Sequence, residues 1–347
     1  MSSSRFLTAY IDLPFIEKLL DNRPDDAMTD PYADSPEMWR NVFLFLQRHA
    51  HIITDVDQET LENRESIQGF LFGERTLDVD IRPGAIQRFV ESQQADVEDP
   101  YTLFLLENPD IPIDELRKQT GLLFLRYSDL ERDWLRLFKP HNIDVSTEAD
   151  EEFKWSHLRQ HGCPLNALVV ADRYAYSQFT NGSFEENLGA LFLSFLSESI
   201  VETVHITLVT DFWKAFEKSA ITPEPNEVHD RIEDHLNLHR PDLNVEVTVL
   251  SYKRGAGHKD RFVFTNYAWF DSNDSFEFFR NGKISKETRI HHVPLYGENG
   301  LTARRYLERF ARINSDPPEH LFPSRPPMLL ASGSAGNRLL GNAHLSS

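Results

Sequence analysis

The sequence predicts an α/β protein with two domains. Its 347 residues exceed the length that a single hydrophobic core normally serves. Short apolar runs alternate with amphipathic stretches in both halves, which is typical of mainly parallel sheets covered by helices. Residues 140–165 interrupt this alternation with prolines, a glycine and an acidic run. We therefore expect an acidic α/β domain over residues 1–145, a connector over 146–164, a second α/β domain over 165–315 and a tail over 316–347.

The elements of the first domain follow from periodicity and from helix end signals. Residues 6–20 predict a buried strand that turns into a helix, because Pro14 fits a first helical turn. Residues 37–49 carry apolar side chains at helical spacing, and residues 51–54 form a short apolar run. The remaining expected elements are a strand over 101–106, a helix over 114–120 that ends at Gly121, a strand over 122–127 and a helix over 130–138.

A second series of elements begins at residue 168. Two apolar runs each end at an aspartate, Asp172 and Asp211, and predict buried strands over 168–171 and 204–210. The other expected elements are helices over 187–196, 212–218 and 227–238 and strands over 245–251 and 261–269. The tail from Pro317 is rich in proline, glycine, serine and asparagine, so we expect it to be disordered or to lie along a partner.

Composition limits the classes of function. The net charge is −19, and residues 1–150 hold 30 acidic against 15 basic residues, which disfavours general coating of nucleic acid. The single cysteine, Cys163, excludes a disulfide within the chain or a zinc site made of several cysteines. No apolar run approaches the ~20 residues of a membrane span, and the N-terminus lacks the pattern of a signal peptide. We expect a cytoplasmic protein without integral membrane association.

Acidic residues follow the predicted strands of the first domain. Asp12, Asp55, Asp57, Glu107 and Asp129 each come at or near a strand end. Ligands of open parallel sheets bind outside the carboxyl ends of the strands, where such acids would hold Mg²⁺ or Mn²⁺ and activate water against a phosphodiester. Alternatively, these residues only cap helices.

The opening Tyr10-Ile11-Asp12 before a helix is similar to the start of PIN-type ribonucleases. This similarity implies a metal-dependent nuclease, with Asp12, Asp55, Asp57 and Asp129 as its catalytic acids and Mg²⁺ or Mn²⁺ as its cofactor. A toxin or an effector of phage defence would be the setting for such an enzyme.

A strand in the second domain carries a spaced polar motif. The motif reads Lys259-x-Arg261-x-x-x-x-Asn266. With Asp172, Asn187 and the aromatic run over 276–279, it resembles the phospholipase D-like C-terminal domain of MIT-domain proteins and similar bacterial proteins, over about residues 165–296. In that family a histidine stands where this chain has Lys259, and residues 272–275 depart from a glycine-rich step.

The resemblance implies a fold and a degenerate phosphodiester site. A phospholipase D-type reaction needs a neutral histidine as nucleophile, and His258 is one residue out of register, which on a strand turns its side chain to the opposite face. We therefore expect recognition of a phosphate-bearing ligand or a protein partner, without a cofactor. Arginine and lysine suit such anions, and the expected binding residues are Lys253, Arg254, Lys259, Arg261 and Asn266. In the alternative, Arg261 only pairs with Asp172 or Asp211.

Histidines on one predicted helix give a weaker metal candidate. His229, His235 and His239 lie on the helix over 227–238 and its end, and the last two have the four-residue spacing that can hold zinc. Because the same helix has its own apolar stripe, we expect the histidines to face solvent. Cys163 has no recognisable histidine partner, so we expect an inert thiol.

Overall fold

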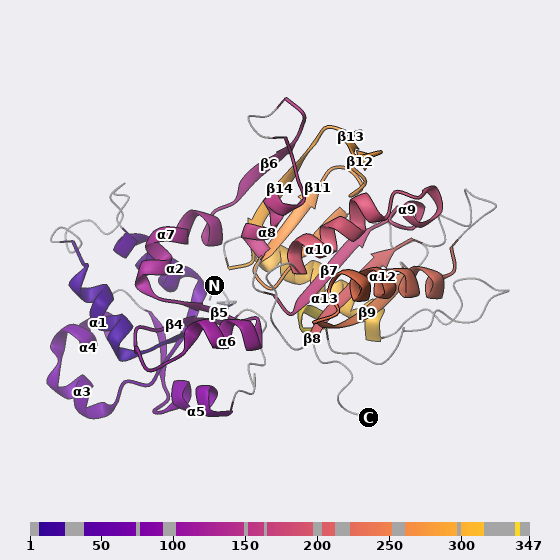
Figure 1. The fold of residues 1–347 in the computed structure, drawn as a ribbon. Coiled ribbons are helices and arrows are strands. Elements are labelled where there is room, and N and C mark those ends of the chain that lie inside the picture. Colours follow the sequence, from indigo (N-terminus) through magenta and orange to yellow (C-terminus); the bar gives the residue numbers. More distant parts are fainter. Residues whose placement is uncertain are drawn as a thin grey trace. The chain divides into compact units, whose positions relative to one another are not determined.

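The described residues form an α/β structure with a five-stranded sheet, a seven-stranded sheet and a separate two-stranded hairpin, and Figure 1 shows the arrangement of the elements. The computed structural model describes two compact units, the first comprising Met1–Lys139 with Tyr296–Gly300 and the second Pro140–Leu295 with Leu301–Ser347. The residues whose structure is described are 7–24, 38–73, 77–92, 102–148, 152–162, 165–196, 203–211, 223–251, 261–296, 300–315 and 337–340.

A parallel sheet forms the centre of the first unit. Its five strands have the order β3-β2-β1-β4-β5, and every neighbouring pair is parallel. The strand order therefore reverses between β1 and β4, the position where open parallel sheets bind ligands. The strands are β1 (Leu7–Ile11), β2 (Ala50–Thr54), β3 (Asp78–Ile81), β4 (Thr102–Leu105) and β5 (Leu123–Leu125).

Helices cover both faces of this sheet (Figure 1). On one face, Phe89 and Phe104 pack with Phe124 in a buried cluster that includes α5 and α6. On the other, Phe45 of α2 packs against Trp134 and Phe138 of α7. The helices are α1 (Leu13–Asp21), α2 (Met38–His49), α3 (Gln58–Asn63), α4 (Glu65–Phe72), α5 (Ala85–Ser92), α6 (Ile113–Thr120) and α7 (Tyr127–Phe138).

The parallel sheet predicted for the first domain is confirmed. The C-cap at Gly121 is also confirmed, because this residue has a φ of 64°, in the left-handed region that favours glycine. The elements between Gln58 and Ser92 were not predicted from the sequence. They include the edge strand β3, whose sequence Asp-Val-Asp-Ile has no buried residue and therefore lacks a strong apolar signal.

The second unit is built on a mixed sheet of seven strands. The order is β6-β14-β11-β10-β7-β8-β9, with β7, β8 and β9 parallel and the other neighbours antiparallel. The strands are β6 (His141–Val145), β7 (Ala167–Asp172), β8 (Thr203–Thr210), β9 (Asn244–Ser251), β10 (Arg261–Phe264), β11 (Ala268–Ser272) and β14 (Thr288–Pro294). A separate hairpin joins β12 (Phe279–Arg280) to β13 (Lys283–Ile284).

The two faces of the mixed sheet have different covers. Leu168 and Val170 belong to a buried cluster with residues of α8, α10 and α12, whereas Phe262 and Phe264 pack against Tyr306 and Phe310 of α13. The helical elements are α8 (Ser156–Gly162), α9 (Tyr176–Asn181), the π-helical turn η2 (Glu185–Gly189), α10 (Ala190–Leu196), α12 (Pro225–His239), α13 (Gly300–Ser315) and the 3₁₀ turn η3 (Arg338–Leu340).

The boundary between the units differs from the expected one. The strand β6 lies within the range 1–145 predicted for the first domain, yet it pairs with β14 in the sheet of the second unit. Its sequence His-Asn-Ile-Asp-Val is too polar to be recognised as a strand, as is usual at a sheet edge. The predicted connector over 146–164 contains α8, and Phe153 and Leu158 are buried in the core of the second unit. The continuous N-terminal part of the first unit therefore ends at Lys139.

Part of the tail predicted over 316–347 is packed. Asn337 is 4% exposed, and its Nδ2 donates to the carbonyl of Leu168 at 3.1 Å and to Oγ1 of Thr207 at 2.9 Å. Leu339 and Leu340 are buried as well. These contacts fix η3 on β7 and β8, so at least this segment is neither disordered nor reserved for a partner. Among the described helices, none has the length and apolarity of a membrane span.

Candidate functional site

Asp12 lies at the carboxyl end of β1, where the strand order reverses. Its carboxylate accepts hydrogen bonds from the backbone N–H groups of Phe15 at 2.8 Å, Glu107 at 3.0 Å and Asn108 at 2.9 Å. The residue is 4% exposed and is the N-cap of α1. Burial raises the pKa of this carboxyl and the charge of Glu107 adds to the effect, against the lowering effect of the three amides. Asp12 thus joins β1, α1 and the segment after β4.

Two other acids, Asp55 and Glu107, interact electrostatically with Asp12. Burial raises the pKa of Asp55, and repulsion from Asp12 is the second cause. The Glu107 carboxylate accepts a hydrogen bond from the backbone N–H of Tyr127 at 2.6 Å, at the start of α7. Acids that follow β1, β2 and β4 therefore lie near the carboxyl edge of the sheet. Two of them, Asp12 and Glu107, already accept hydrogen bonds from backbone N–H groups.

The other two predicted catalytic acids are engaged elsewhere. Asp57 is exposed and caps α3, accepting from the N–H of Thr60 at 2.6 Å. Asp129 accepts from Arg117 at 2.5 Å and from Arg132 at 3.0 Å, and its pKa is lowered by the backbone N–H of Arg126 and these two arginines despite its burial. Among the described residues, these acids do not form a set of three with ligand atoms within 4.8 Å of one another. In the described part of the chain, therefore, no common metal site is formed by the predicted acids Asp12, Asp55, Asp57 and Asp129.

Replacing Asp55 should stabilise the first unit at neutral pH. A carboxyl whose pKa is raised by folding contributes stability below its ordinary pKa and loses it as the pH rises through the raised value. We expect Asp55→Asn to gain on the order of 0.5 kcal/mol at pH 7 after solvent screening, with the gain vanishing in acid. Urea unfolding across pH 4–8 measures this, with Glu59→Gln on the exposed side of α3 as control. A loss of stability at pH 7, or a rise in Tm with Mn²⁺ that Asp55→Asn abolishes, would contradict this account.

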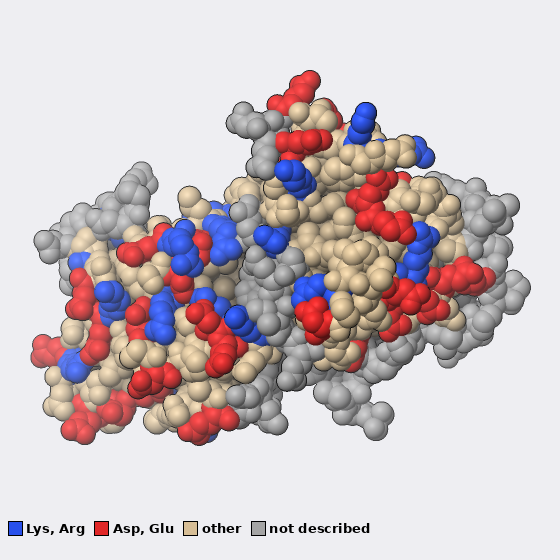
Figure 2. Space-filling model, in the orientation of Figure 1, with Lys and Arg blue, Asp and Glu red and all other residues tan. Residues whose placement is uncertain are grey.

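The helix α12 carries the group best placed for a metal among the described residues. Ligand atoms of His229, Asp230 and Glu233 lie within 4.8 Å of one another. His229 is 6% exposed, contrary to the expectation that it faces solvent, and its Nδ1 lies 2.8 Å from a carboxylate oxygen of Asp230. The rings of His235 and His239 are 4.5 Å apart, and His239 also bonds to the carbonyl of His235. Acidic side chains gather over α12 in Figure 2, so this group belongs to a generally acidic surface.

In the second unit, Asp172 is the buried centre of the carboxyl edge of the sheet. It is the last residue of β7 and has no exposed surface. Its carboxylate accepts from the N–H of Tyr174 at 2.9 Å, the hydroxyl of Ser275 at 2.5 Å and the N–H of Phe276 at 2.8 Å. Burial raises the pKa of Asp172, against these three hydrogen bonds and the charge of Arg261.

Two arginines approach one tyrosine at this edge. Arg261 opens β10 directly opposite Asp172, and its guanidinium lies 5.7 Å from the ring centroid of Tyr174. The guanidinium of Arg173 lies 5.8 Å from the same centroid and pairs with Asp211 at 3.2 Å. Arg261 also donates to the carbonyl of Asn273, whereas its Nε is buried without a hydrogen-bond partner. The arrangement combines cation–π contacts with a guanidinium whose donors are only partly used.

The motif residue Asn266 lies away from this edge. The strand β10 ends at Phe264, and Asn266 follows in the next turn with 3% exposure. Its side chain accepts from the N–H groups of Asn166 and Ala167, both at 3.1 Å, at the start of β7. Arg261 is at the other end of the same strand pair. The expectation that the motif spacing places Arg261 and Asn266 together near Asp172 is therefore corrected.

Other predicted residues have no described position. Lys253, Arg254, Lys259 and His258 lie between β9 and β10, outside the described residues, and Cys163 also lies outside them. The described residues on either side, Ser251 at the end of β9 and Arg261 at the start of β10, lie at the carboxyl edge of the parallel strands.

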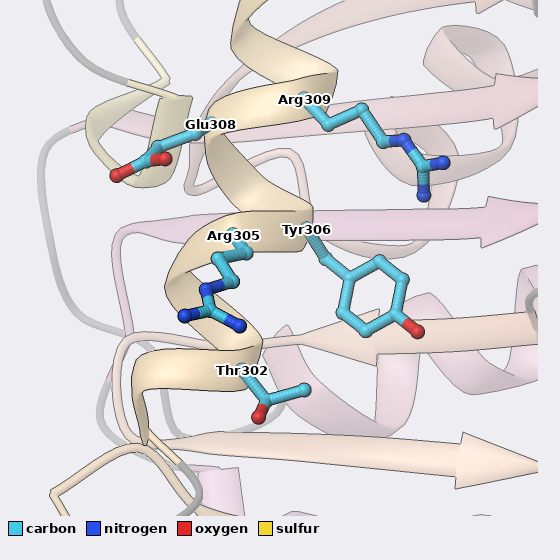
Figure 3. A pocket seen from close by; sticks show the side chains of 5 residues that line it. All are labelled: Thr302, Arg305, Tyr306, Glu308 and Arg309. Atoms are coloured by element: carbon cyan, nitrogen blue, oxygen red, sulfur yellow. The ribbon is translucent and has the colours of Figure 1, made fainter.

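The helix α13 and its surface were not predicted from the sequence. Thr302, Arg305, Tyr306, Glu308 and Arg309 line a cavity of about 480 Å³ (Figure 3). Arg309 and Tyr306 extend to one side of the helix in this view, and Arg305 and Glu308 extend to the other. The sequence did offer a signal for a helix with a basic surface, because arginines recur at helical spacing between residues 304 and 312.

Comparison with known protein families gives no match for this chain, and a comparison with curated proteins gives none either.

Proposed function

We propose that the second unit recognises an anionic ligand at the carboxyl edge of its sheet without catalysing a reaction there. The observation that carries the proposal is the pair of guanidiniums, of Arg173 and Arg261, on the ring of Tyr174 beside the buried Asp172. Arginine with unused donors is well suited to phosphate and carboxylate. The ligand class is a phosphate-bearing molecule or an acidic segment of a protein partner.

The charge balance at this edge supports an anion. Asp211 is paired with Arg173 and Asp274 with Lys286, so two of the acids near Arg261 are already compensated. The Asp172 carboxylate already accepts hydrogen bonds from Tyr174, Ser275 and Phe276. The segment 252–260, which precedes Arg261 in the sequence, carries three basic residues against one acid, in a chain whose net charge is −19.

The residues of this edge that the structure describes support recognition over catalysis. Lys259 stands where a phospholipase D-type motif has its histidine, and a protonated amine does not attack phosphorus. Asp172 is buried with three hydrogen bonds to protein groups, so it is not available as a general acid or base for an exposed ligand. The proposal includes a degenerate phospholipase D-like fold, which the pairing of the motif strand with the strand of Asp172 supports.

Replacing Arg261 should weaken anion binding by about tenfold, because each charge-assisted hydrogen bond contributes roughly 1.5–3 kcal/mol. The measurement is isothermal titration with inorganic pyrophosphate at low salt, comparing wild type with Arg261→Gln. Arg289→Gln is the matched control, because Arg289 is exposed and pairs with Asp144 at 2.7 Å on the edge strands β14 and β6. Equal affinities for wild type and Arg261→Gln, with both folded by circular dichroism, would sink the proposal.

A further inference from the structure

One side-chain amide attaches the 3₁₀ turn η3 to the sheet of the second unit. Asn337 directly precedes this turn and is 4% exposed. Its Nδ2 donates to the carbonyl of Leu168 on β7 at 3.1 Å and to Oγ1 of Thr207 on β8 at 2.9 Å, and it lies 3.4 Å from the carbonyl of His205. An amide nitrogen carries two hydrogens, so these oxygens use its full donor capacity. The two strands therefore present a formed site for one amide.

The turn itself is closed by its own hydrogen bonds. Oδ1 of Asn337 accepts from the N–H of Leu339 at 3.1 Å, and the carbonyl of Asn337 accepts from the N–H of Leu340 at 2.9 Å. Such local closure by an asparagine side chain does not depend on the sheet. Leu339 and Leu340 are buried, with 5% and 3% exposure. The η3 segment, residues 337–340, thus has the features of a short peptide ligand, with one polar anchor and two apolar ones.

A long stretch of chain connects the η3 segment to α13. This helix ends at Ser315, and residues 316–336 follow with five prolines and the run Ser-Gly-Ser-Ala-Gly directly before Asn337. The entropy lost on closing a loop grows only slowly with its length, so a connection of this length opposes docking of the segment only weakly. The segment then occupies its site as a tethered ligand, at an effective concentration on the order of mM or below.

We propose that the surface of β7 and β8 beneath η3 is a peptide-binding site, from which a partner segment of the same chemistry displaces the η3 segment. The partner carries an asparagine followed, two and three positions later, by leucines, because these side chains are buried when the site is filled. Asparagine is selected over aspartate. An ionised carboxylate has no hydrogen to donate to the carbonyls of Leu168 and His205, and its charge would face their oxygens.

This site is separate from the anion site proposed around Arg261. Asn337 contacts Leu168, four positions before Asp172 at the carboxyl end of β7. At about 3.3 Å per residue, the two sites are roughly 13 Å apart along the strand. Failure of one proposal therefore leaves the other intact.

A fluorescently labelled peptide with the sequence of residues 334–341 tests the proposal by anisotropy titration into the 347-residue protein. In Asn337→Asp the chain's own segment loses its amide donor, so we expect the site to open and to bind the peptide saturably. Wild type should bind it at least tenfold more weakly, because its own segment competes at its effective concentration. The same peptide with Asn337→Asp should bind to the Asn337→Asp protein at least tenfold more weakly than the original peptide.

Two threonines of β8 give a matched pair in the Asn337→Asp background. Thr207→Val removes the hydroxyl that accepts from the asparagine amide, and should weaken binding of the peptide about tenfold. Thr203→Val is the control and should bind like its parent, because the hydroxyl of Thr203 accepts instead from the side chain of Asn244 at 3.0 Å.

Equal affinities of wild type and Asn337→Asp would mean that the peptide binds elsewhere and would overturn the proposal. Absence of binding to a folded Asn337→Asp protein would do the same. If Asn337→Asp fails to fold by circular dichroism, the η3 segment is an integral part of the core, and the proposal is wrong on that ground as well.

Discussion

Asn187→Ala should destabilise the second unit by about 3–5 kcal/mol, the largest effect that we expect from a single substitution. Asn187 has no exposed surface and uses both ends of its amide. Its Nδ2 donates to the carbonyls of Ser183 at 3.0 Å and Phe279 at 2.9 Å, and its Oδ1 accepts from the N–H groups of Phe278 at 2.8 Å and Phe279 at 2.9 Å. Alanine would leave four backbone groups buried without these partners.

Urea unfolding monitored by circular dichroism measures this effect. Asn181→Ala is the matched control, because Asn181 is exposed and its amide donates to Glu277 on the surface. We expect the control to lose less than about 1 kcal/mol. A loss of similar size in both variants would show that the hydrogen bonds from the buried amide of Asn187 to Phe278 and Phe279 do not stabilise the second unit.

Asp172→Ala should cost about 2–4 kcal/mol, because the N–H groups of Tyr174 and Phe276 and the hydroxyl of Ser275 lose their common acceptor. Asp172→Asn should lose less, since its carbonyl oxygen can still accept from one or two of these groups.

The pH dependence gives this prediction a second readout. Because the pKa of Asp172 is raised by burial, its contribution is greatest below the ordinary range of a carboxyl and declines as the pH rises through the raised value. The difference in unfolding free energy between wild type and Asp172→Ala should therefore shrink from pH 4 to pH 8. A difference that grows over this range would mean that the carboxylate form is the favoured one in the folded protein.

Much of the fold could be predicted, because apolar periodicity reports directly on burial. The strands β1, β2, β4 and β5 are short apolar runs, and each was expected within a few residues. The polar edge strands β3 and β6 were not predicted, because an edge strand is held by pairing with its neighbour and needs little hydrophobicity of its own. The predicted first domain extends to residue 145, beyond Lys139, because the polar strand β6 was not recognised.

The sites could be predicted only in part, because spacing fixes a position along a strand but not the partners of a side chain. Asp12 was expected at a strand end, yet its carboxylate is held by amides 95 and 96 residues away. The spacing of Arg261 and Asn266 suggested one shared site, but β10 is too short to hold both. Tyr174 follows Asp172 in the sequence, and only the folded sheet brings it to Arg261.

The central claim, recognition without catalysis at the edge around Arg261, is tested most directly by measuring binding and turnover on the same sample. Bis(4-nitrophenyl) phosphate is titrated into the wild-type protein and Arg261→Gln, and released 4-nitrophenol is followed by absorbance. We predict saturable binding that Arg261→Gln weakens, with release no faster than in buffer alone. Release of 4-nitrophenol by wild type that disappears in Arg261→Gln would contradict the account and identify this edge as an active site.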